Sequence, residues 1–245
     1  MHLRYRSVLP LVAICIAFAI PAFAAKPAPT TLATQPPTST SSITSAAALC
    51  QLGVLIPPAQ AYGFIEGPND DYYTLINPAD CSGCPGPLVL TNAHVLHFFP
   101  LGDIPCDIPV EVSIVRPSDP NAACLVPNPF DVVCDPVAYV IAYPGIDDAC
   151  VDFQLPLTAA CCISGPVFLK FSYGVGSCPP GRPGVCGHNP AAIAACTQYN
   201  FHPIYGNCDM GTQCGVDINM WADADCCINT PTLPGSWGKV KTLYR

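Results

Sequence analysis

The residues whose types and spacing could support binding chemistry lie near the end of the chain, between positions 216 and 225. Polar and aromatic residues occupy every second position there: Asp217, Asn219, Trp221, Asp223 and Asp225. Alternation with period two is typical of a strand whose side chains point to opposite faces. An aromatic ring among carboxylates and an amide is how proteins hold sugars, by stacking on the ring and hydrogen bonds to hydroxyls. We take this face as a candidate glycan-binding surface.

The same face has other interpretations. Its carboxylates are the hard oxygen ligands that calcium prefers. It could equally be a solvated sheet face, or a bulge could turn Trp221 into the core, because tryptophan is usually largely buried. In a regular strand the apolar positions face the core, and these are Val216, Ile218, Met220, Ala222 and Ala224. Trp221 and its polar companions then face solvent.

Catalytic motifs are mostly absent. The sequence has no G-x-S-x-G, H-E-x-x-H or P-loop motif. His94 and His97 lie three apart in a strand-like run, which sends their side chains to opposite faces and argues against a shared metal. His188 in a loop and His202 at a strand end are expected to be surface or hydrogen-bonded histidines. We name no catalytic residue, although triads assemble in space and a hydrolytic site stays an alternative.

Residues 1–24 have the features of an export signal. Arg4 and Arg6 form the charged start, residues 8–20 the apolar stretch, and Ala22-Phe23-Ala24 the small-x-small cleavage pattern. A single membrane anchor is the competing interpretation, but the apolar stretch is short. We expect cleavage before Ala25.

Cysteine usage indicates the same export. The chain has 17 cysteines and Cys15 lies in the signal, so 16 remain, an even count that predicts a disulfide framework. The candidate disulfide cysteines are Cys50, Cys81, Cys84, Cys106, Cys124, Cys134, Cys150, Cys161, Cys162, Cys178, Cys186, Cys196, Cys208, Cys214, Cys226 and Cys227. Zinc is the alternative, but only Cys81 and Cys84 have ligand-like spacing, with no second such pair.

Spacing does not fix which cysteines pair. Nearest-neighbour guesses are Cys124–Cys134, Cys186 with Cys178 or Cys196, and Cys208–Cys214. The adjacent pairs at 161–162 and 226–227 carry more information, because neighbouring strand residues point to opposite faces and can bridge in two directions at once. A vicinal disulfide is the strained alternative.

Short apolar stretches among 30 prolines and 18 glycines predict an all-β fold. Strands are expected at 62–66, 72–77, 88–99, 110–116, 137–143, 151–157, 167–173, 197–202 and 216–225, with loops at 174–195 and 205–215. Without intervening helices they predict a disulfide-rich antiparallel β-sandwich, jelly-roll-like. We expect strands 151–157 and 167–173, separated by the turn at Gly165-Pro166, to form the centre of one disulfide-pinned sheet.

The expected organisation is a signal peptide (1–24), a Pro/Thr/Ser-rich flexible linker (25–45), the β-sandwich domain (46–228), and a linker with a C-terminal tail (229–245). The stretch Ser236-Trp-Gly-Lys-Val-Lys-Thr-Leu-Tyr-Arg245 resembles the Ser-Trp-Gly-x-x-Lys-x-x-Tyr-Arg endings of uncharacterised secreted cysteine-rich bacterial β-sandwich proteins. The resemblance brings no activity with it. The tail is either a sorting or docking tag or an ordinary frayed terminus.

These observations predict a secreted or cell-surface, non-catalytic structural, adhesion or ligand-binding protein. A glycan-binding module, with or without calcium, is the alternative, and an extracellular hydrolase is third. The expected partner is a cell-surface glycan or another envelope component, and no cofactor is expected. A net charge of −8 with nine scattered basic residues argues against nucleic acid as a partner. The sequence has no apolar run of 18 residues, so we expect no membrane span after signal cleavage.

Overall fold

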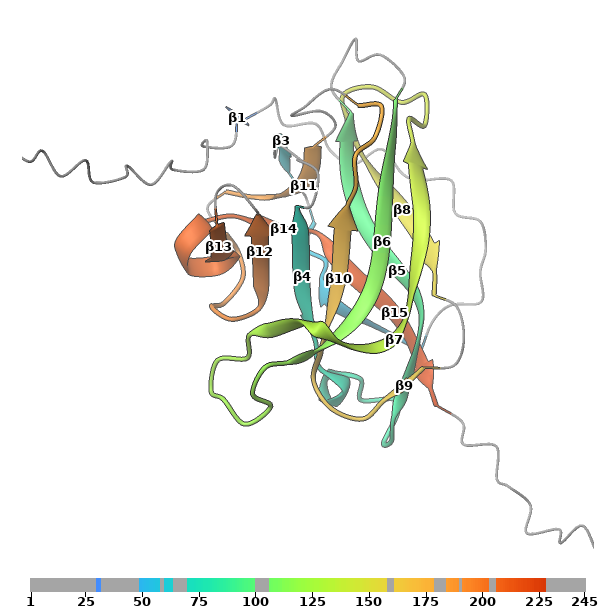
Figure 1. Ribbon diagram of the computed structural model, residues 1–245, viewed down its shortest axis with the longest axis vertical. Helices are drawn as coiled ribbons and strands as arrows, with labels where there is room; N and C mark the ends of the chain where they lie inside the picture. Colours follow the sequence, from blue (N-terminus) through green and yellow to red (C-terminus); the bar gives the residue numbers. More distant parts are fainter. Residues whose placement is uncertain are drawn as a thin grey trace, which may run out of the picture.

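The computed structural model describes residues 30–31, 49–57, 60–63, 70–99, 106–157, 161–178, 184–189, 191–202 and 206–227 (Figure 1). The predicted signal peptide, the tail at 229–245 and most of the linker at 25–45 lie outside these residues. Among the described residues, no helix is long and apolar enough to cross a membrane.

Two antiparallel sheets form the body of the molecule (Figure 1). The larger sheet has nine strands. Along its main path the strands follow the order β1 (Thr30–Thr31), β3 (Gln60–Gly63), β11 (Gly184–His188), β5 (Leu88–Phe99), β15 (Met220–Cys226) and β2 (Cys50–Val54). Beside this path, β14 (Asp217–Ile218) pairs with β11, and both β8 (Ala149–Pro156) and β9 (Cys162–Ile163) pair with β5. The smaller sheet has six strands in the order β13 (Gly206–Asp209), β12 (Gln198–His202), β4 (Asp71–Ile76), β10 (Val167–Tyr173), β6 (Asp107–Pro117), β7 (Pro127–Ala142). The predicted all-β, disulfide-rich antiparallel β-sandwich is confirmed.

Two short helical turns complete the described secondary structure: η1 (Pro78–Asp80) and η2 (Met210–Cys214). Each begins at a residue whose side chain accepts a backbone N–H, Asn77 for η1 and Asp209 for η2. Such capping satisfies donors that the first turn leaves without a partner.

The core fills the space between the sheets. Leu169 and Phe171 of β10 face Val95 of β5 and Met220 of β15 in one buried cluster. The register of β5 against β15 shifts by one residue next to Asp223, so that Thr91 opposes no residue of β15. This bulge changes which positions of β5 face inward, because strand side chains alternate between faces.

The expected pairing of residues 151–157 with 167–173 is wrong. β8 pairs with β5 in the nine-stranded sheet, whereas β10 lies between β4 and β6 in the six-stranded sheet. The chain from β8 to β10 therefore crosses from one sheet to the other. Both strands alternate as predicted, but alternation alone does not say which strand is the neighbour.

The region expected to be a loop between 174 and 195 contains β11. This strand pairs with β3, β5 and β14, and its sequence Gly-Val-Cys-Gly-His shows no alternation. A Cβ at Gly187 would lie 1.7 Å from the carbonyl oxygen of Asp217, so only glycine permits this close approach. β13 likewise occupies part of the expected loop at 205–215.

All sixteen candidate cysteines form disulfides. The pairs are Cys50–Cys81, Cys84–Cys226, Cys106–Cys178, Cys124–Cys196, Cys134–Cys161, Cys150–Cys186, Cys162–Cys227 and Cys208–Cys214. The guess of Cys208–Cys214 is confirmed, whereas the other nearest-neighbour guesses are wrong. The prediction that adjacent cysteines bridge to separate partners is confirmed at both pairs.

The two pairs of adjacent cysteines are joined to each other. Cys162 bonds to Cys227, while their neighbours Cys161 and Cys226 bond to Cys134 and Cys84. One covalent chain therefore connects β7, the segment before β10, the end of β15 and the segment before β5. Sequence spacing could not reveal this linkage of the two adjacent-cysteine pairs. The cysteines come close only because the chain crosses from one sheet to the other between β8 and β10.

Removal of a bridge that closes a long loop should cost more stability than removal of one that closes a short loop. Cys84 and Cys226 are 142 residues apart and Cys208 and Cys214 only six. Chain entropy gives about 5 kcal/mol for the first and about 2 kcal/mol for the second. We expect urea unfolding to show this order for the two Cys→Ala double variants, each of which leaves no unpaired thiol. An equal or reversed order would contradict the argument.

Candidate functional site

The face of residues 217–225 is not the solvated surface that alternation predicted. Ile218, Met220, Ala222 and Ala224 do face the core, as predicted. On the opposite side Asp217, Asn219 and Asp223 are also buried, Trp221 is only 5 % exposed, and Asp225 alone is exposed. The expected solvent exposure of Trp221 is therefore wrong. Its ring stacks on the His94 ring of β5, with 4.7 Å between centroids and 11° between planes.

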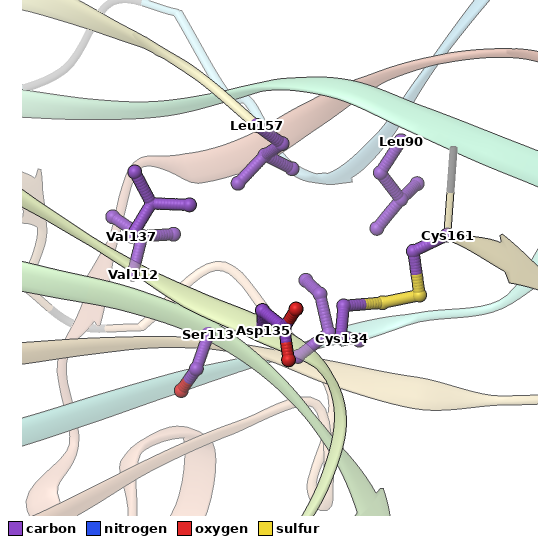
Figure 2. Close-up of a pocket in the computed structure, with 9 residues that line it drawn as sticks. Leu90, Val112, Ser113, Cys134, Asp135, Val137, Leu157 and Cys161 are labelled. Carbon is purple, nitrogen blue, oxygen red and sulfur yellow. A yellow bond between two sulfur atoms is a disulfide. The ribbon is translucent and has the colours of Figure 1, made fainter. Parts of the chain in front are cut away.

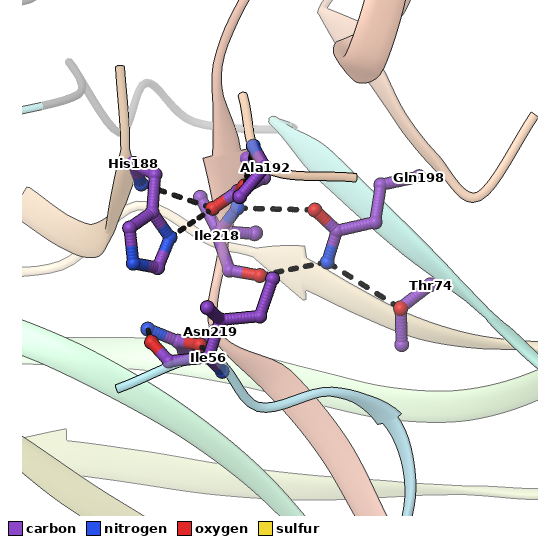
Figure 3. Close-up of polar contacts among 8 residues, drawn as sticks. Ile56, Thr74, His188, Ala192, Gln198, Ile218 and Asn219 are labelled. Carbon is purple, nitrogen blue, oxygen red and sulfur yellow. Dashed lines mark hydrogen bonds and ion pairs between the residues drawn. The ribbon is translucent and has the colours of Figure 1, made fainter. Parts of the chain in front are cut away.

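Asp217 and Asn219 anchor loops. The buried Asp217 carboxylate accepts hydrogen bonds from the backbone N–H of His188 (2.9 Å) and of Ala192 (2.6 Å), and it lies 2.8 Å from His188 Nδ1. Asn219 accepts from the N–H of Ile56 at 2.8 Å, and Figure 3 shows these groups around the strand. A buried carboxylate needs such donors because its desolvation is costly.

Gln198 of β12 completes this buried network. Its side-chain amide accepts from the N–H of Ile218 at 3.0 Å and donates to the carbonyl of Ile218 at 2.7 Å (Figure 3). A side chain of the six-stranded sheet thus pairs with the backbone of the nine-stranded sheet. The network joins the two sheets through polar contacts.

Trp221 and Asp223 belong to a second cluster, around His94. His94 Nδ1 lies 3.0 Å from a carboxylate oxygen of Asp152 on β8, and Nε2 lies 3.1 Å from Asp223 on β15. Asp223 also accepts from Asn92 (3.2 Å) and Gln51 (3.1 Å). Side chains of β8, β5, β15 and β2 are therefore linked across the outer face of the larger sheet.

The pKa of His94 is raised above its ordinary value of 6.5. Burial alone lowers this pKa, but hydrogen bonds and charges of Asp152 and Asp223 outweigh the effect. Both ring nitrogens contact carboxylates, so the imidazolium is held as a bridge between strands. The carboxylates lie on opposite nitrogens of the ring, so this arrangement does not gather three ligands around one metal ion.

The other histidines of the described residues are engaged with neighbours as well. His97 is fully buried on the core side of β5, where Nε2 lies 2.9 Å from the hydroxyl of Tyr173. Burial lowers the pKa of His97 to about 3, so the ring is neutral. The prediction that His94 and His97 point to opposite faces is confirmed. His188 contacts Asp217, and His202 is buried in β12.

One cluster in the described part of the chain has the residue types of a metal site: Cys124, Cys196 and Asp209. The two sulfur atoms are bonded to each other, and Asp209 accepts from the N–H of Cys196 at 2.6 Å. Metal-ligating cysteines must be thiolates. The cluster therefore holds a disulfide and a loop in place.

Two hollows flank β7. The first lies between the sheets, lined by Leu90, Val112, Val137 and Leu157, with Asp135 and the Cys134–Cys161 bridge also along its wall (Figure 2). Its space of about 10 Å³ holds roughly one water molecule. The second is an open groove of about 500 Å³ between the ends of β6 and β7 and residues 162–167. Of these two hollows, the groove is the one large enough for a peptide or a small ligand.

Exposed apolar side chains gather on and beside β7. Phe130 is 93 % exposed, Val140 is 63 % exposed, and Val126 and Val132 are also exposed. β7 pairs with β6 and with no other described strand, so its outer edge is free within the described structure. Phe130 is therefore an aromatic side chain that lies largely in solvent.

Comparisons with known proteins give no relative. No protein-family model, no curated protein and no solved structure matches the chain.

Sequence reasoning missed the His94 cluster. His94, Asp152 and Asp223 come from three strands, and 58 residues separate the first two. The polar parity of each strand is visible in the sequence, but the pairing of β8 with β5 is not. The exposed side of the β6–β7 hairpin was also missed, because Pro127, Pro129 and Pro136 interrupt its strand pattern.

Trp221→Ala should destabilise the fold. A buried tryptophan truncated to alanine typically costs about 3–5 kcal/mol, and Trp221 is buried against His94. We expect a loss of this size in chemical unfolding, with no such loss for the control Phe130→Ala, whose ring is 93 % exposed. A change within about 0.5 kcal/mol for Trp221→Ala, the size of an ordinary surface substitution, would show that the ring is not core.

Asp152→Asn should lower the pKa of His94, because it removes one of the two carboxylates that raise it. A raised folded-state pKa stabilises the fold fully below 6.5, and this contribution is lost as pH rises through the folded value. The wild type should therefore exceed Asp152→Asn in stability in mild acid, with the difference shrinking at alkaline pH. NMR titration of His94, with the exposed Asp147→Asn as control, measures the shift. An unchanged His94 pKa would refute the assignment.

Proposed function

We propose that the protein is exported and serves as a non-catalytic structural or adhesion protein of the cell surface, with the exposed apolar side of the β6–β7 hairpin as its contact surface. The single observation that carries the proposal is the exposure of Phe130 beside Val126 and Val132. Exposed aromatic side chains are enriched at the centres of protein interfaces.

The disulfide framework supports action outside the cytoplasm. Eight bridges hold both sheets, and disulfides form and persist in oxidising compartments such as the periplasm and the cell exterior. The signal-like residues 1–24 point to the same compartment.

The contact surface is held rigidly. The turn between β6 and β7, at the lower left of Figure 1, is tied to the segment before β12 by the Cys124–Cys196 bridge. It is tied to β12 itself by a hydrogen bond from the Tyr199 hydroxyl to the carbonyl of Leu125 (2.8 Å). Leu125 packs against Tyr199 and Phe168 on the outer face of the smaller sheet. Phe130 thus projects from an anchored ribbon, which reduces the ordering cost of binding.

The polar clusters support a structural role. Asp217, Asn219 and both nitrogens of His94 are engaged with groups of the fold itself. The glycan-binding alternative depended on an exposed Trp221, whose ring instead lies against His94. We assign the partner as a protein component of the envelope, because the exposed side chains are apolar and offer few hydrogen bonds to sugar hydroxyls.

Phe130→Asp should abolish the contact. The test is co-sedimentation of the exported protein with isolated cell envelopes, with Val175→Asp, also strongly exposed, as the control. We expect at least about tenfold weaker binding for Phe130→Asp, which corresponds to about 1.4 kcal/mol. Equal binding of wild type and variant would overturn the assignment of the surface.

Two further outcomes would redirect the function. Binding to purified polysaccharide that depends on Phe130 would favour the glycan-binding alternative over a protein partner. Turnover of ester, peptide or glycoside substrates by the purified protein would overturn the non-catalytic assignment.

A further inference from the structure

The open groove beside β7 has a defined wall and no occupant among the described residues. Its lining combines apolar and polar residues, and the apolar ones include Pro117, Val133, Ile163, Pro166 and Val167. At its rim Arg116 and Asp131 form an ion pair at 2.9 Å. We propose that this groove is the docking site for residues 236–245 of the same chain, with Trp237 as the buried anchor.

The chain leaves the described fold directly at this groove. Cys162 is one of the lining residues, and it is bonded to Cys227, the last described residue. Residues 228–245 therefore start from a point that a covalent bond fixes to the groove wall.

The intervening segment is long enough. Ten residues separate Cys227 from Trp237, and a chain of that length extends to about 33–36 Å. A short tether of this kind raises the local concentration of the tethered segment to the millimolar range. Docking to the groove of the same molecule is therefore favoured over docking to a second copy at ordinary protein concentrations.

The chemistry of the segment matches the groove and its surroundings. Residues 236–245 contain Trp237, Val240, Leu243 and Tyr244 together with three cations and no acid. All 17 acidic residues of the chain lie between Glu66 and Asp225, with only three basic residues among them. An apolar, cationic segment thus meets an apolar groove on an acidic domain.

An exposed acidic residue lies beside the groove. Asp119 lies between two lining residues, Ser118 and Pro120. Arg116 is the one basic lining residue, and its charge is paired with Asp131. Lys239 and Lys241 can therefore approach the exposed carboxylate of Asp119, which accepts a hydrogen bond from the backbone N–H of Asn121 at 2.9 Å. Complementary charge favours the encounter.

This inference is independent of the envelope contact proposed above. The tail would bind in the groove lined by Asp131 and Val133, whereas the envelope partner would contact Phe130. Phe130→Asp is expected to leave the docking of residues 236–245 unchanged, so the two proposals fail separately.

Iodide quenching of Trp237 tests the docking in the full exported chain. Trp221 is 5 % exposed and contributes a protected background, which the variant Trp237→Phe measures. We expect Trp237 to be several-fold less quenched than in a free peptide of residues 236–245, at every protein concentration. Quenching equal to that of the free peptide would overturn the proposal, and protection that disappears on dilution would assign the groove to a second copy instead.

Two substitutions locate the docking site. Val133→Arg places a cation in the groove and should raise Trp237 quenching to the level of the free peptide, whereas Val140→Arg on the same strand, outside the groove, should not. The double variant Lys239→Glu, Lys241→Glu leaves the described fold untouched and should have the same effect as Val133→Arg. Protection that survives both changes would overturn the assignment of this groove.

Discussion

The Cys162–Cys227 bridge is the constraint around which the rest of the structure is arranged. Because each of these cysteines has a bonded cysteine beside it, the single bridge becomes part of a covalent chain from Cys134 to Cys84. That chain fixes the end of β15 and the crossing from β8 to β10 against β7. The groove, the exit of the chain at residue 227 and the position of β7 all follow from it.

Polar groups buried in the larger sheet are the second constraint. Asp217 of β14 and Asp223 of β15 are buried, so their carboxylates need partners inside the protein. The His94 bridge supplies them for Asp223, and the loops after β11 supply them for Asp217. A paired network of buried charges favours one arrangement of strands over others, because any change of register leaves a buried charge without a partner.

The local sequence pattern predicted those features that depend only on neighbouring residues in the sequence, such as strand bounds and the directions of adjacent side chains. The strands at residues 88–99 and 167–173 were predicted with the bounds that the structure shows. The adjacent cysteines were predicted to form disulfides with separate partners, and they do. Strand neighbours and covered faces depend on the whole fold, which explains the errors at β8, β10 and Trp221. The residues of the His94 cluster and of the groove come from distant segments, so no short window of sequence contains them.

Thermal unfolding in strong reductant tests the central claim that covalent bonds hold this sandwich together. Each bridge contributes about 2–4 kcal/mol, whereas a domain has a net stability of roughly 5–15 kcal/mol, so the loss of several bridges exceeds the total. The fully reduced protein, with reduction confirmed by thiol titration, is predicted to show no cooperative transition. A melting temperature unchanged from that of the oxidised protein would contradict the account.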